Sequence, residues 1–568
     1  KFLPVKNKEL AQIFNRMADA LEFRGENPFK VGAYRKVARR LSDLSEDIEI
    51  IAKEGRLCEV PGIGKAISKK IKEYLKTGEM KSYKDTLSSI PNGLLDLIEI
   101  QGIGPKTLGL IYSRLNVESI EELENVIRDG SLARLPGMGG KRVSNIQKSI
   151  EYFKKSEGRI LLGTALPLID EIINELKKAG VKKVSPAGSF RRIRDTVGDL
   201  DILAAGEDGG KVIKIFTELP IVERVLAAGK TKGSVLIKGG IQIDLRVVEE
   251  SSYGSALQYF TGSKSHNIKL RKIAMKKGLK LNEYGVFRGD EKMAGKIEGE
   301  VYAALDLPYI PPELREDGGE IEAAISGKLP KLVEMEDIKG DLHVHSKYSD
   351  GTASLKEIAL ESKKFGYDYV AVCDHSRSAK YARGLSIDLL SERNREIDLL
   401  NDKIEGITLL KGTEVDILGD GSLDYPDDLL KELDLVVAAI HQGFEKNVTE
   451  RMLSAMDDPN VDVIAHPTGR LISGREGYEV DLDKIIKRAK ETKTALEINA
   501  YPDRLDLNDI NCRKAKEGGI KLSIGTDAHS LGMMRYMNLG IGVARRGWLE
   551  KEDVLNTSPS DKLRKVMS

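Results

Sequence analysis

The sequence predicts a chain of several domains: an all-α N-terminal region, an α+β middle region and a C-terminal (β/α) barrel of about seven strands. A Gly-x-Gly turn followed by an amphipathic helical run recurs in the first 150 residues. A strand-and-helix region with paired aspartates follows, and strand-then-helix units fill residues 340–568. At 568 residues the chain is long enough for each region to have its own core.

Charge is divided unevenly along the chain. Residues 1–300 carry 53 Lys and Arg against 40 Asp and Glu, whereas residues 301–568 carry 37 against 49. A basic half favours a polyanionic partner, and an acidic half with clustered histidines favours metal cations.

The cysteines exclude a disulfide scaffold and a thiolate zinc ribbon. Cys58, Cys373 and Cys512 are far apart and form no CxxC pair, which suits a reducing compartment. No apolar run approaches the roughly 18 residues of a membrane span, and no signal peptide is recognised. We therefore expect a cytoplasmic, monomeric protein without a membrane partner.

The recurring turn reads VPGIG from Val60, IQGIG from Ile100 and LPGMG from Leu135. Its glycines allow a close backbone approach, and the following helix directs unpaired N–H groups at the same place, which suits a phosphate. One copy would be an ordinary helix-joining turn, but three resemble helix-hairpin-helix motifs, which hold the nucleic-acid backbone without reading bases. The expected DNA-binding residues are Gly62, Gly64, Gly102, Gly104, Gly137, Gly139, Lys65, Lys106 and Lys141.

The stretch PAGSFRRIRDTVGDLDILAAG, residues 186–206, combines a Gly-Ser turn, arginines and two aspartates. Side chains alternate along a strand, so Asp199 and Asp201 are expected on one face. Asp244 stands in the apolar strand IQIDLRVV, where a carboxylate is costly unless it is paired or binds a metal. Surface acids would explain the first pair alone, but the three together predict a site for divalent metal and polyphosphate.

Gly-Ser, Asp-x-Asp and a distant Asp resemble the nucleotidyltransferases, which include family X DNA polymerases and RNA- or antibiotic-modifying enzymes. The stretch YGSALQYFTGSKSHNIKLRKIAMKKGLKLNEYGVF, residues 253–287, narrows this, because YFTGS and LNEYG resemble the thumb of the DNA polymerase beta family. The resemblance begins near the N-terminus, where VGAYRKVARRL looks like that family's lyase-domain helix.

This resemblance implies templated DNA synthesis at a site with two Mg²⁺ ions. Asp199 and Asp201 would bridge the ions, and Asp244 would complete the site of the ion that activates the primer 3′-hydroxyl. The implied dNTP and DNA contacts are Gly188, Ser189 and Arg192 (triphosphate), Tyr259, Phe260 and Gly262 (sugar), Asn267 (base edge) and Arg271 (template). Gln242 departs from the family, where an arginine helps hold the third acid.

A lyase activity is also implied. Lys70 aligns with the family's Schiff-base lysine, and Tyr34, Lys30 and Lys65 would hold a 5′-phosphate. A basic helix that faces DNA is the alternative interpretation, since an amine nucleophile must have a lowered pKa.

Six of the seven histidines lie in residues 341–530. Apolar runs that end in polar clusters, such as GDLHVHS, YDYVAVCDHS and KLSIGTDAH, predict parallel barrel strands with functional residues at their C-terminal ends. Every such strand end except TALEINA supplies a common metal ligand. Imidazoles with bridging carboxylates suit Mn²⁺ or Zn²⁺, and clustered ions favour phosphoester hydrolysis.

DLHVHS, CDHS and TDAH resemble the polymerase-and-histidinol-phosphatase (PHP) family across residues 340–565. The resemblance implies up to three Mn²⁺ or Zn²⁺ ions. The ligands would be His343, His345, Glu414 and Asp527 for one ion, Glu414, His441 and His466 for the second, and Asp350, His375 and His529 for the third. Arg470 and Arg504 would contact substrate phosphates.

The whole chain thus resembles bacterial and archaeal family X DNA polymerases with a C-terminal PHP domain. The expected segments are a lyase-like helical domain with the first hairpin (1–85), a fingers or DNA-binding hairpin region (86–155), the palm (156–250), the thumb (251–315), a linker (316–339) and a PHP phosphoesterase barrel (340–568). Expected partners are dNTPs and gapped or primer–template DNA. The expected activities are gap filling in base-excision repair and 3′→5′ exonuclease, with abasic-site endonuclease or 3′-phosphatase activity as additions.

Two other classes remain open from the sequence. One is a nucleotidyltransferase for RNA or a small molecule, fused to a phosphatase of the histidinol-phosphatase kind. The other is a DNA-binding scaffold whose PHP half is structural.

Overall fold

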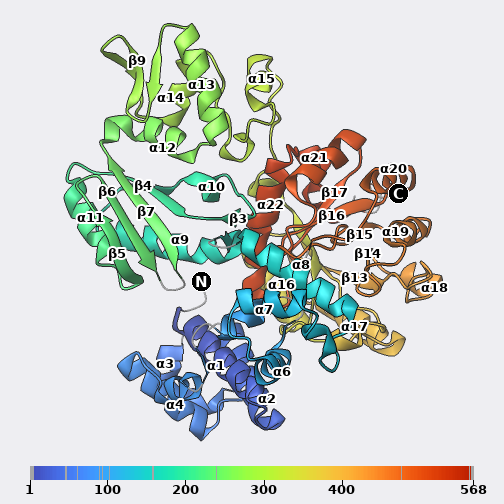
Figure 1. Cartoon of the computed structure of the whole chain (residues 1–568). Coiled ribbons are helices and arrows are strands. Elements are labelled where there is room, and N and C mark those ends of the chain that lie inside the picture. Colours follow the sequence, from blue (N-terminus) through green and yellow to red (C-terminus); the bar gives the residue numbers. More distant parts are fainter. Residues whose placement is uncertain are drawn as a thin grey trace. The chain divides into compact units, whose positions relative to one another are not determined.

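The computed structural model describes residues 5–563 except 45–47, 61, 89, 92–93, 101–102, 157–158, 238–239, 475 and 562. The chain divides into two compact units (Figure 1). The first is Lys1–Glu157 with the short stretches Ser473–Glu476 and Ser530–Gly532, and the second holds all other residues. Among the described helices, none is long and apolar enough to cross a membrane.

The described elements of residues 5–156 are all helices. They are α1 (Val5–Phe23), α2 (Pro28–Asp43), α3 (Ile48–Lys53), η1 (Arg56–Glu59), α4 (Lys65–Thr77), α5 (Lys81–Leu87), η2 (Leu94–Glu99), α6 (Pro105–Leu115), α7 (Ile120–Arg128), η3 (Leu132–Arg134) and α8 (Gly140–Ser156). Two hydrophobic clusters hold them, one from residues 10–80 and the other mainly from residues 90–150.

The three Gly-x-Gly turns share one geometry. The residue between the glycines is buried and donates its N–H to the carbonyl three residues earlier. These residues are Ile63, Ile103 and Met138, with N···O distances of 3.0, 3.0 and 3.1 Å. The second glycine stands directly before a helix: Gly64 before α4, Gly104 before α6 and Gly139 before α8. A Cβ on any of these three would meet no described atom within 4 Å, so another molecule has room beside each helix N-terminus.

The remaining hairpin residues are described in part. Gly62 and Gly137 have φ of +93° and +76°, a region that favours glycine. Lys65 and Lys106 are exposed at the start of their helices. Gly102 lies outside the described residues, as does the side chain of Lys141.

The palm is a five-stranded sheet in the order β2-β4-β7-β6-β5. Its strands are β2 (Lys183–Pro186), β4 (Leu200–Ala205), β5 (Val222–Ala228), β6 (Lys232–Ile237) and β7 (Ile241–Val248). Two helices pack against the sheet, α9 (Leu162–Lys178) and α11 (Gly209–Thr217). The connection from β2 to β4 contains the short helix α10 (Gly188–Arg191) and the strand β3 (Thr196–Val197). Strand β3 pairs with β1 (Ile160–Leu161). Only β4 and β7 are parallel neighbours within this sheet. That pairing decides where the acids meet.

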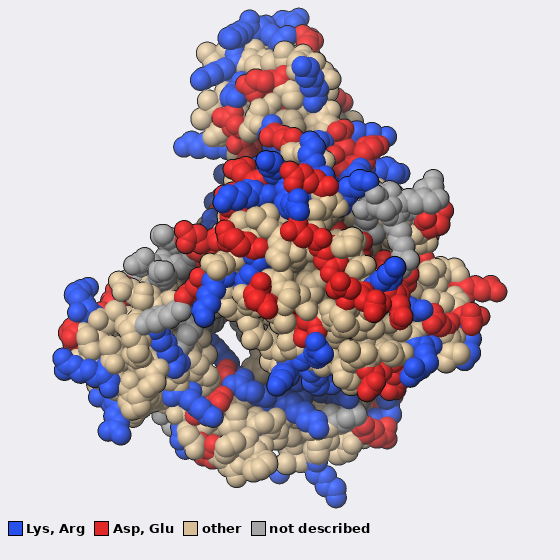
Figure 2. Space-filling view, turned by 90° about the vertical axis from the view of Figure 1, so that its right-hand side faces the viewer, with Lys and Arg blue, Asp and Glu red and all other residues tan. Residues whose placement is uncertain are grey.

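The thumb follows the palm in sequence. It comprises η4 (Glu250–Ser252), α12 (Tyr253–Thr261), α13 (Lys264–Lys276), the antiparallel strands β8 (Lys280–Asn282), β9 (Gly285–Arg288) and β10 (Glu291–Ala294), and α14 (Glu298–Ala303). Lys and Arg side chains are frequent on this uppermost lobe of Figure 2. Buried Glu298 binds Arg191 of the palm at 2.8 Å and Arg315 at 2.5 Å. Burial raises the pKa of Glu298, but the two guanidinium groups outweigh it and hold the pKa at about 2.

The segment 316–339 packs against the domains on either side of it. It follows η5 (Pro312–Leu314) and contains α15 (Glu320–Ile325) and η6 (Met335–Asp337). Ile321, Ala324 and Leu332 belong to the hydrophobic cluster of the thumb. Glu320 is buried and accepts a hydrogen bond from His266 Nδ1 at 2.7 Å.

The barrel contains seven parallel strands in sequential order, β11 to β17. The strands are β11 (Gly340–Val344), β12 (Tyr369–Val372), β13 (Thr408–Asp416), β14 (Leu435–Ala439), β15 (Val463–Ile464), β16 (Ala495–Asn499) and β17 (Leu522–Gly525). The helices after them are α16 (Leu355–Lys364), α17 (Ile387–Asn401), α18 (Asp427–Leu430), α19 (Val448–Met456), α20 (Leu482–Thr492), α21 (Asp509–Gly518) and α22 (Met537–Arg546). Short turns, η7 (Lys380–Ala382), η8 (Leu531–Tyr536), η9 (Lys551–Asp553) and η10 (Leu555–Thr557), complete the unit. A bridge between Val344 and Ala528 nearly closes the barrel, so the predicted (β/α)7 fold is confirmed.

Candidate active sites

Two carboxylates of the palm lie side by side because β4 and β7 pair in parallel. Asp201 is directly opposite Asp244, and Asp199 lies in the bend just before β4. Burial, and then repulsion by the other two acids, raises the pKa of Asp201 to about 7. Three acids that repel one another in a half-buried place are stabilised by added positive charge. The donor set therefore fits divalent cations that prefer oxygen ligands.

Two neighbours hold Asp244. Gln242 Nε2 donates to Asp244 Oδ1 at 2.9 Å, and Lys232 Nζ lies 2.7 Å from Asp244 Oδ2. Burial raises the pKa of Asp244, but the hydrogen bonds from Lys232 and Gln242 outweigh it, so the pKa is lowered. The amide and the ammonium together supply the donor and the charge that one arginine supplies in the family.

We expect Gln242→Ala to lower the rate of primer extension by about 10- to 100-fold, the usual cost of losing a partner of a metal ligand. Asp244 would keep Lys232 but lose the donor that orients its other oxygen. Single-turnover extension at saturating nucleotide measures the effect. Arg224→Ala, on exposed β5, is the control. An unchanged rate for Gln242→Ala would show that Lys232 alone positions the acid.

A cavity of about 520 Å³ lies beside the palm acids. It brings together the residues of palm and thumb that the resemblance assigns to the dNTP and the template, with two of the acids: Gly188, Ser189, Arg192, Tyr259, Phe260, Gly262, Asn267, Arg271, Asp199 and Asp201. Gly188 has φ +58°, and a Cβ there would lie 2.3 Å from Asp201 Oδ2, so only glycine fits. Asn267 is held in place by hydrogen bonds to Gln258 and to the carbonyl of Tyr259, both 2.7 Å.

Arg159 also lines this cavity and was not expected from the sequence. Its guanidinium donates to the hydroxyl and the carbonyl of Thr196, at 3.0 and 2.6 Å. A lone arginine ahead of an apolar run gives no signal, because only the pairing of β1 with β3 brings it to the pocket.

The barrel gathers all nine expected ligands around Glu414. This carboxylate contacts nitrogens of His343 (3.7 Å), His345 (3.8 Å), His375 (2.8 Å), His441 (3.2 Å) and His466 (3.1 Å). Asp527 lies 3.1 Å from His345, and Asp350 lies 3.2 Å from His529. The residues come from the C-terminal ends of the strands, as the sequence predicts.

Unpartnered polar atoms show that this cluster fits metal ions. Within the described residues, buried nitrogens of His343, His345, His375 and His466 and one oxygen of Glu414 have no hydrogen-bond partner. Three groups have ligand atoms close enough for one ion: His345, Asp350, His375 and His529; His343, His345 and Asp527; and His375, Glu414 and His441. These groups differ from the expected sets in three ways: His345 and His375 each appear in an additional group, Glu414 is absent from the group of His343, His345 and Asp527, and His466 is in none. The palm aspartates form no such group in the described part of the chain.

Two further carboxylates orient the histidines, and the sequence did not suggest them. Glu497 Oε1 lies 2.7 Å from His343 Nδ1, and Asp416 Oδ1 lies 2.6 Å from His441 Nδ1. Such contacts fix which ring nitrogen faces a metal. Glu497 lies in TALEINA, the strand expected to contribute nothing; a buried acid in an apolar strand was the signal, as it was for Asp244.

Backbone strain occurs at two of the candidate ligands. His466 and Asp527 have φ of +29° and +52°, values that residues other than glycine seldom adopt. Strain of this kind persists where surrounding structure enforces a functional geometry.

Arg470 and Arg504, the two arginines expected to contact substrate phosphates, differ in how far the protein itself engages their guanidinium groups. Arg470 donates to the carbonyls of Arg504 and Leu505 and pairs with Asp195, so its guanidinium is engaged in structure. Arg504 lies 3.9 Å from Asp527, and its Nη1 has no partner among the described residues. Arg504 therefore remains the better placed of the two for an anionic substrate.

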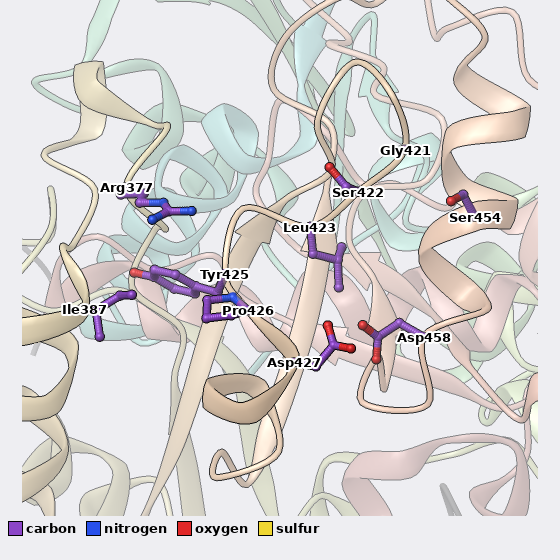
Figure 3. Close-up of a pocket in the computed structure, with 10 residues that line it drawn as sticks. All are labelled: Arg377, Ile387, Gly421, Ser422, Leu423, Tyr425, Pro426, Asp427, Ser454 and Asp458. Atoms are coloured by element: carbon purple, nitrogen blue, oxygen red, sulfur yellow. The ribbon is translucent and has the colours of Figure 1, made fainter.

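A second cavity of about 500 Å³ opens in the barrel domain between the loop before α18 and helix α19 (Figure 3). Arg377 and Tyr425 lie on one side of it, and Ser454 and Asp458 on the other. None of the nine candidate ligands lines it, so we assign the chemistry to the histidine cluster.

The candidate lyase residues lie together in part. Lys70 Nζ is 5.9 Å from the centre of the Tyr34 ring, and Tyr34 is nearly buried against Phe14. Lys30 Nζ lies 3.5 Å from Glu26, and Lys65 is exposed.

Four segments of the chain match models of known families. Residues 5–80 match the helix-hairpin-helix domain, and residues 94–151 the SAM-like helix-hairpin-helix tandem. Residues 256–316 match the DNA polymerase beta thumb, and residues 341–530 the PHP domain.

Relatives cover either the whole chain or the barrel alone. The chain is 40% identical over 560 residues to "DNA polymerase/3'-5' exonuclease PolX" of Bacillus subtilis, covering 97% of each protein. A "Probable phosphatase" of Thermoanaerobacter is 32% identical over 233 residues, 38% of this chain and 89% of its own length. Another from Acetivibrio thermocellus is 29% identical over 203 residues, 33% of this chain and 78% of its own length.

Hairpins, palm and thumb with an attached histidine-rich barrel define a polymerase of the beta type joined to a PHP phosphoesterase domain. The chain belongs to the PolX family, the family X DNA polymerases with a C-terminal PHP domain.

Proposed function

We propose that this polymerase and 3′→5′ exonuclease fills short gaps in DNA during base-excision repair, and that its two activities belong to two separate metal sites. The observation that carries the proposal is the palm cavity, in which Asp199 and Asp201 meet all the expected nucleotide contacts. The chain covers 97% of the polymerase and exonuclease that it resembles.

In the palm, Asp199, Asp201 and Asp244 would hold two Mg²⁺ ions. Bound there, the ions supply positive charge that stabilises the attacking and leaving oxygens of nucleotidyl transfer. Gly188, Ser189 and Arg192 bind the triphosphate, and Arg271 the template strand. Tyr259 and Phe260, whose rings meet edge to face at 5.2 Å, form the wall against the sugar. Asn267, whose amide accepts from Gln258 and donates to the carbonyl of Tyr259, would contact the base edge.

In the barrel, the nine ligands would hold up to three Mn²⁺ or Zn²⁺ ions, which activate water and bind the scissile phosphate. Glu497 and Asp416 keep the ring nitrogens of His343 and His441 turned toward Glu414. Arg504 offers a cation to the phosphate. The phosphatase relatives match this domain alone, which favours 3′-phosphatase activity in addition to exonuclease activity. Cleavage at abasic sites is a further proposal for the same site.

In the helical region, the three hairpins hold the DNA backbone through Gly62, Gly64, Gly102, Gly104, Gly137 and Gly139 with Lys65, Lys106 and Lys141. Lyase chemistry at Lys70, with Tyr34 and Lys30, is the second proposal for this region. We further propose the domain boundaries given above, a monomer, and action on chromosomal DNA in the cytoplasm.

Extension of one labelled primer on a one-nucleotide gap with a 5′-phosphate, on a ten-nucleotide gap and on an open template tests the proposal. We expect higher kcat/KM on the short gap, since the hairpins of residues 60–64 and 135–139 would hold both sides of the break. Addition of each nucleotide should follow the template. Equal efficiency on all three substrates would refute gap filling, and untemplated addition would favour a different nucleotidyltransferase.

A further inference from the structure

The palm segment that carries Arg192 rests on the barrel. Arg192 lines the palm cavity, and the next residue, Ile193, has φ +53°, which a β-branched residue avoids. Ile193 packs against α22 at Gly542, where a Cβ would lie 2.5 Å from Ile193 Cγ2. Arg470 of the barrel pairs with Asp195, two residues further along, at 3.1 Å. The backbone beside the cavity is thus held by a different domain.

The guanidinium group of Arg192 is also held by residues outside the palm. Its Nε donates to Glu316 Oε1 at 2.9 Å, and its Nη1 donates to the carbonyl of Thr261. The same oxygen of Glu316 accepts from Arg546 Nη1 of α22 at 3.1 Å. Arg546 Nη1 also donates to the backbone carbonyl of Arg192 at 2.8 Å. This one barrel arginine therefore contacts both the backbone of Arg192 and the carboxylate that holds its side chain.

Burial and charge make this arrangement rigid without neutralising Arg192. The side chains of Arg192 and Arg546 are 14% and 5% exposed, and that of Glu316 is 26% exposed. Arg546 is fixed in the barrel by Asp509 through its other nitrogen. Arg194 Nη1 lies 3.9 Å from the same oxygen of Glu316. Three guanidinium groups therefore face the two carboxylates of Glu316 and Asp509, and the cluster keeps a positive charge for an anion.

We propose that Glu316 and Arg546 are positioning residues of the polymerase, through which the barrel keeps Arg192 ready to receive the nucleotide triphosphate. This rests on the proposed nucleotide site. An arginine that is already ordered loses less side-chain entropy when it binds a phosphate, which raises affinity for the nucleotide. Neither residue contacts the reacting atoms, so the chemical step itself should change little.

Steady-state extension of a one-nucleotide gap by the full-length protein tests this. Glu316→Gln keeps the shape but loses the charge; we expect KM for the dNTP to rise roughly tenfold, the usual effect of weakening one charge-assisted hydrogen bond. The value of kcat should stay within about twofold. Glu313→Gln is the matched control, because Glu313 pairs with the neighbouring Arg545 of α22 at 2.8 Å and does not line the cavity. Exonuclease rate and melting temperature should be equal in both variants.

Arg546→Lys is the second variant, since lysine keeps the charge but cannot reproduce both contacts; KM should rise less than with Glu316→Gln. Arg192→Gln separates the two proposals. If it raises KM while Glu316→Gln and Arg546→Lys leave KM unchanged, the positioning role fails alone. If Arg192→Gln also leaves KM unchanged, the nucleotide site is misplaced and both proposals fail. A fall in kcat with constant KM would likewise overturn the positioning role.

Discussion

Asp244→Asn should abolish primer extension, by more than about 100-fold, while 3′→5′ shortening of the same primer continues. We expect at least this loss of rate because removing a residue that only orients a metal ligand already lowers activity by about 10- to 100-fold. Asp244 is itself a proposed metal ligand. Asparagine fits the space between Gln242 and Lys232 but removes the negative charge that the site offers a cation. Labelled primer on a one-nucleotide gap, with and without dNTP, reports both activities in one experiment.

The control is Glu223→Gln, which removes an exposed acid from β5 of the same sheet. It should extend and shorten like the unsubstituted protein. Removing Asp244 also relieves repulsion on Asp201, whose raised pKa depends partly on that neighbour. Unfolding is therefore not the expected cause of inactivity, and equal melting temperatures would verify this. Should shortening vanish together with extension, the two activities would not belong to separate sites.

The sequence predicted those features that depend on local pattern. The three hairpins recur at spacings of 40 and 35 residues, and each has a buried apolar residue between its glycines and a helix that starts after the second glycine. The barrel ligands follow because parallel strands deliver their C-terminal residues to one end of a barrel. Asp199 and Asp201 were predicted from the alternation of side chains along a strand, and Asp244 because an acid in an apolar strand requires a partner.

Features that depend on strand register and domain packing were missed. Lys232 reaches Asp244 only because β6 pairs with β7, and Arg159 reaches the pocket through the pairing of β1 with β3. The segment 316–339 was predicted to be a linker because the stretch from Tyr309 to Gly340 is rich first in proline and then in acidic residues. Its apolar residues Ile321 and Leu332 instead join the thumb core, which places Glu316 beside Arg192. No composition rule distinguishes a packed connection of this kind from a loose one.

Glu414→Gln should eliminate exonuclease activity, by more than about 100-fold, and leave extension intact. Glu414 lies within 3.8 Å of a nitrogen of each of five imidazoles. Losing its charge should therefore disturb more than one ion. Burial raises the pKa of Glu414, but His441, His375 and His343 outweigh it and hold the pKa well below its usual range. Glutamine leaves those imidazoles without their shared counter-charge.

Two measurements besides activity distinguish a loss of metal binding in Glu414→Gln from a general loss of structure. Mn²⁺ added to the metal-free protein should raise the melting temperature, since a ligand that binds only the folded state stabilises it. Glu414→Gln should lose most of that increase and retain fewer Mn²⁺ ions after dialysis, whereas Glu405→Gln, an exposed acid ahead of the same strand, should match the unsubstituted protein. If Glu414→Gln bound Mn²⁺ normally but lost activity, the carboxylate would act on substrate instead of metal. If shortening of the primer persisted, the barrel would not be the exonuclease, and its substrate would be a phosphate monoester of the kind its phosphatase relatives suggest.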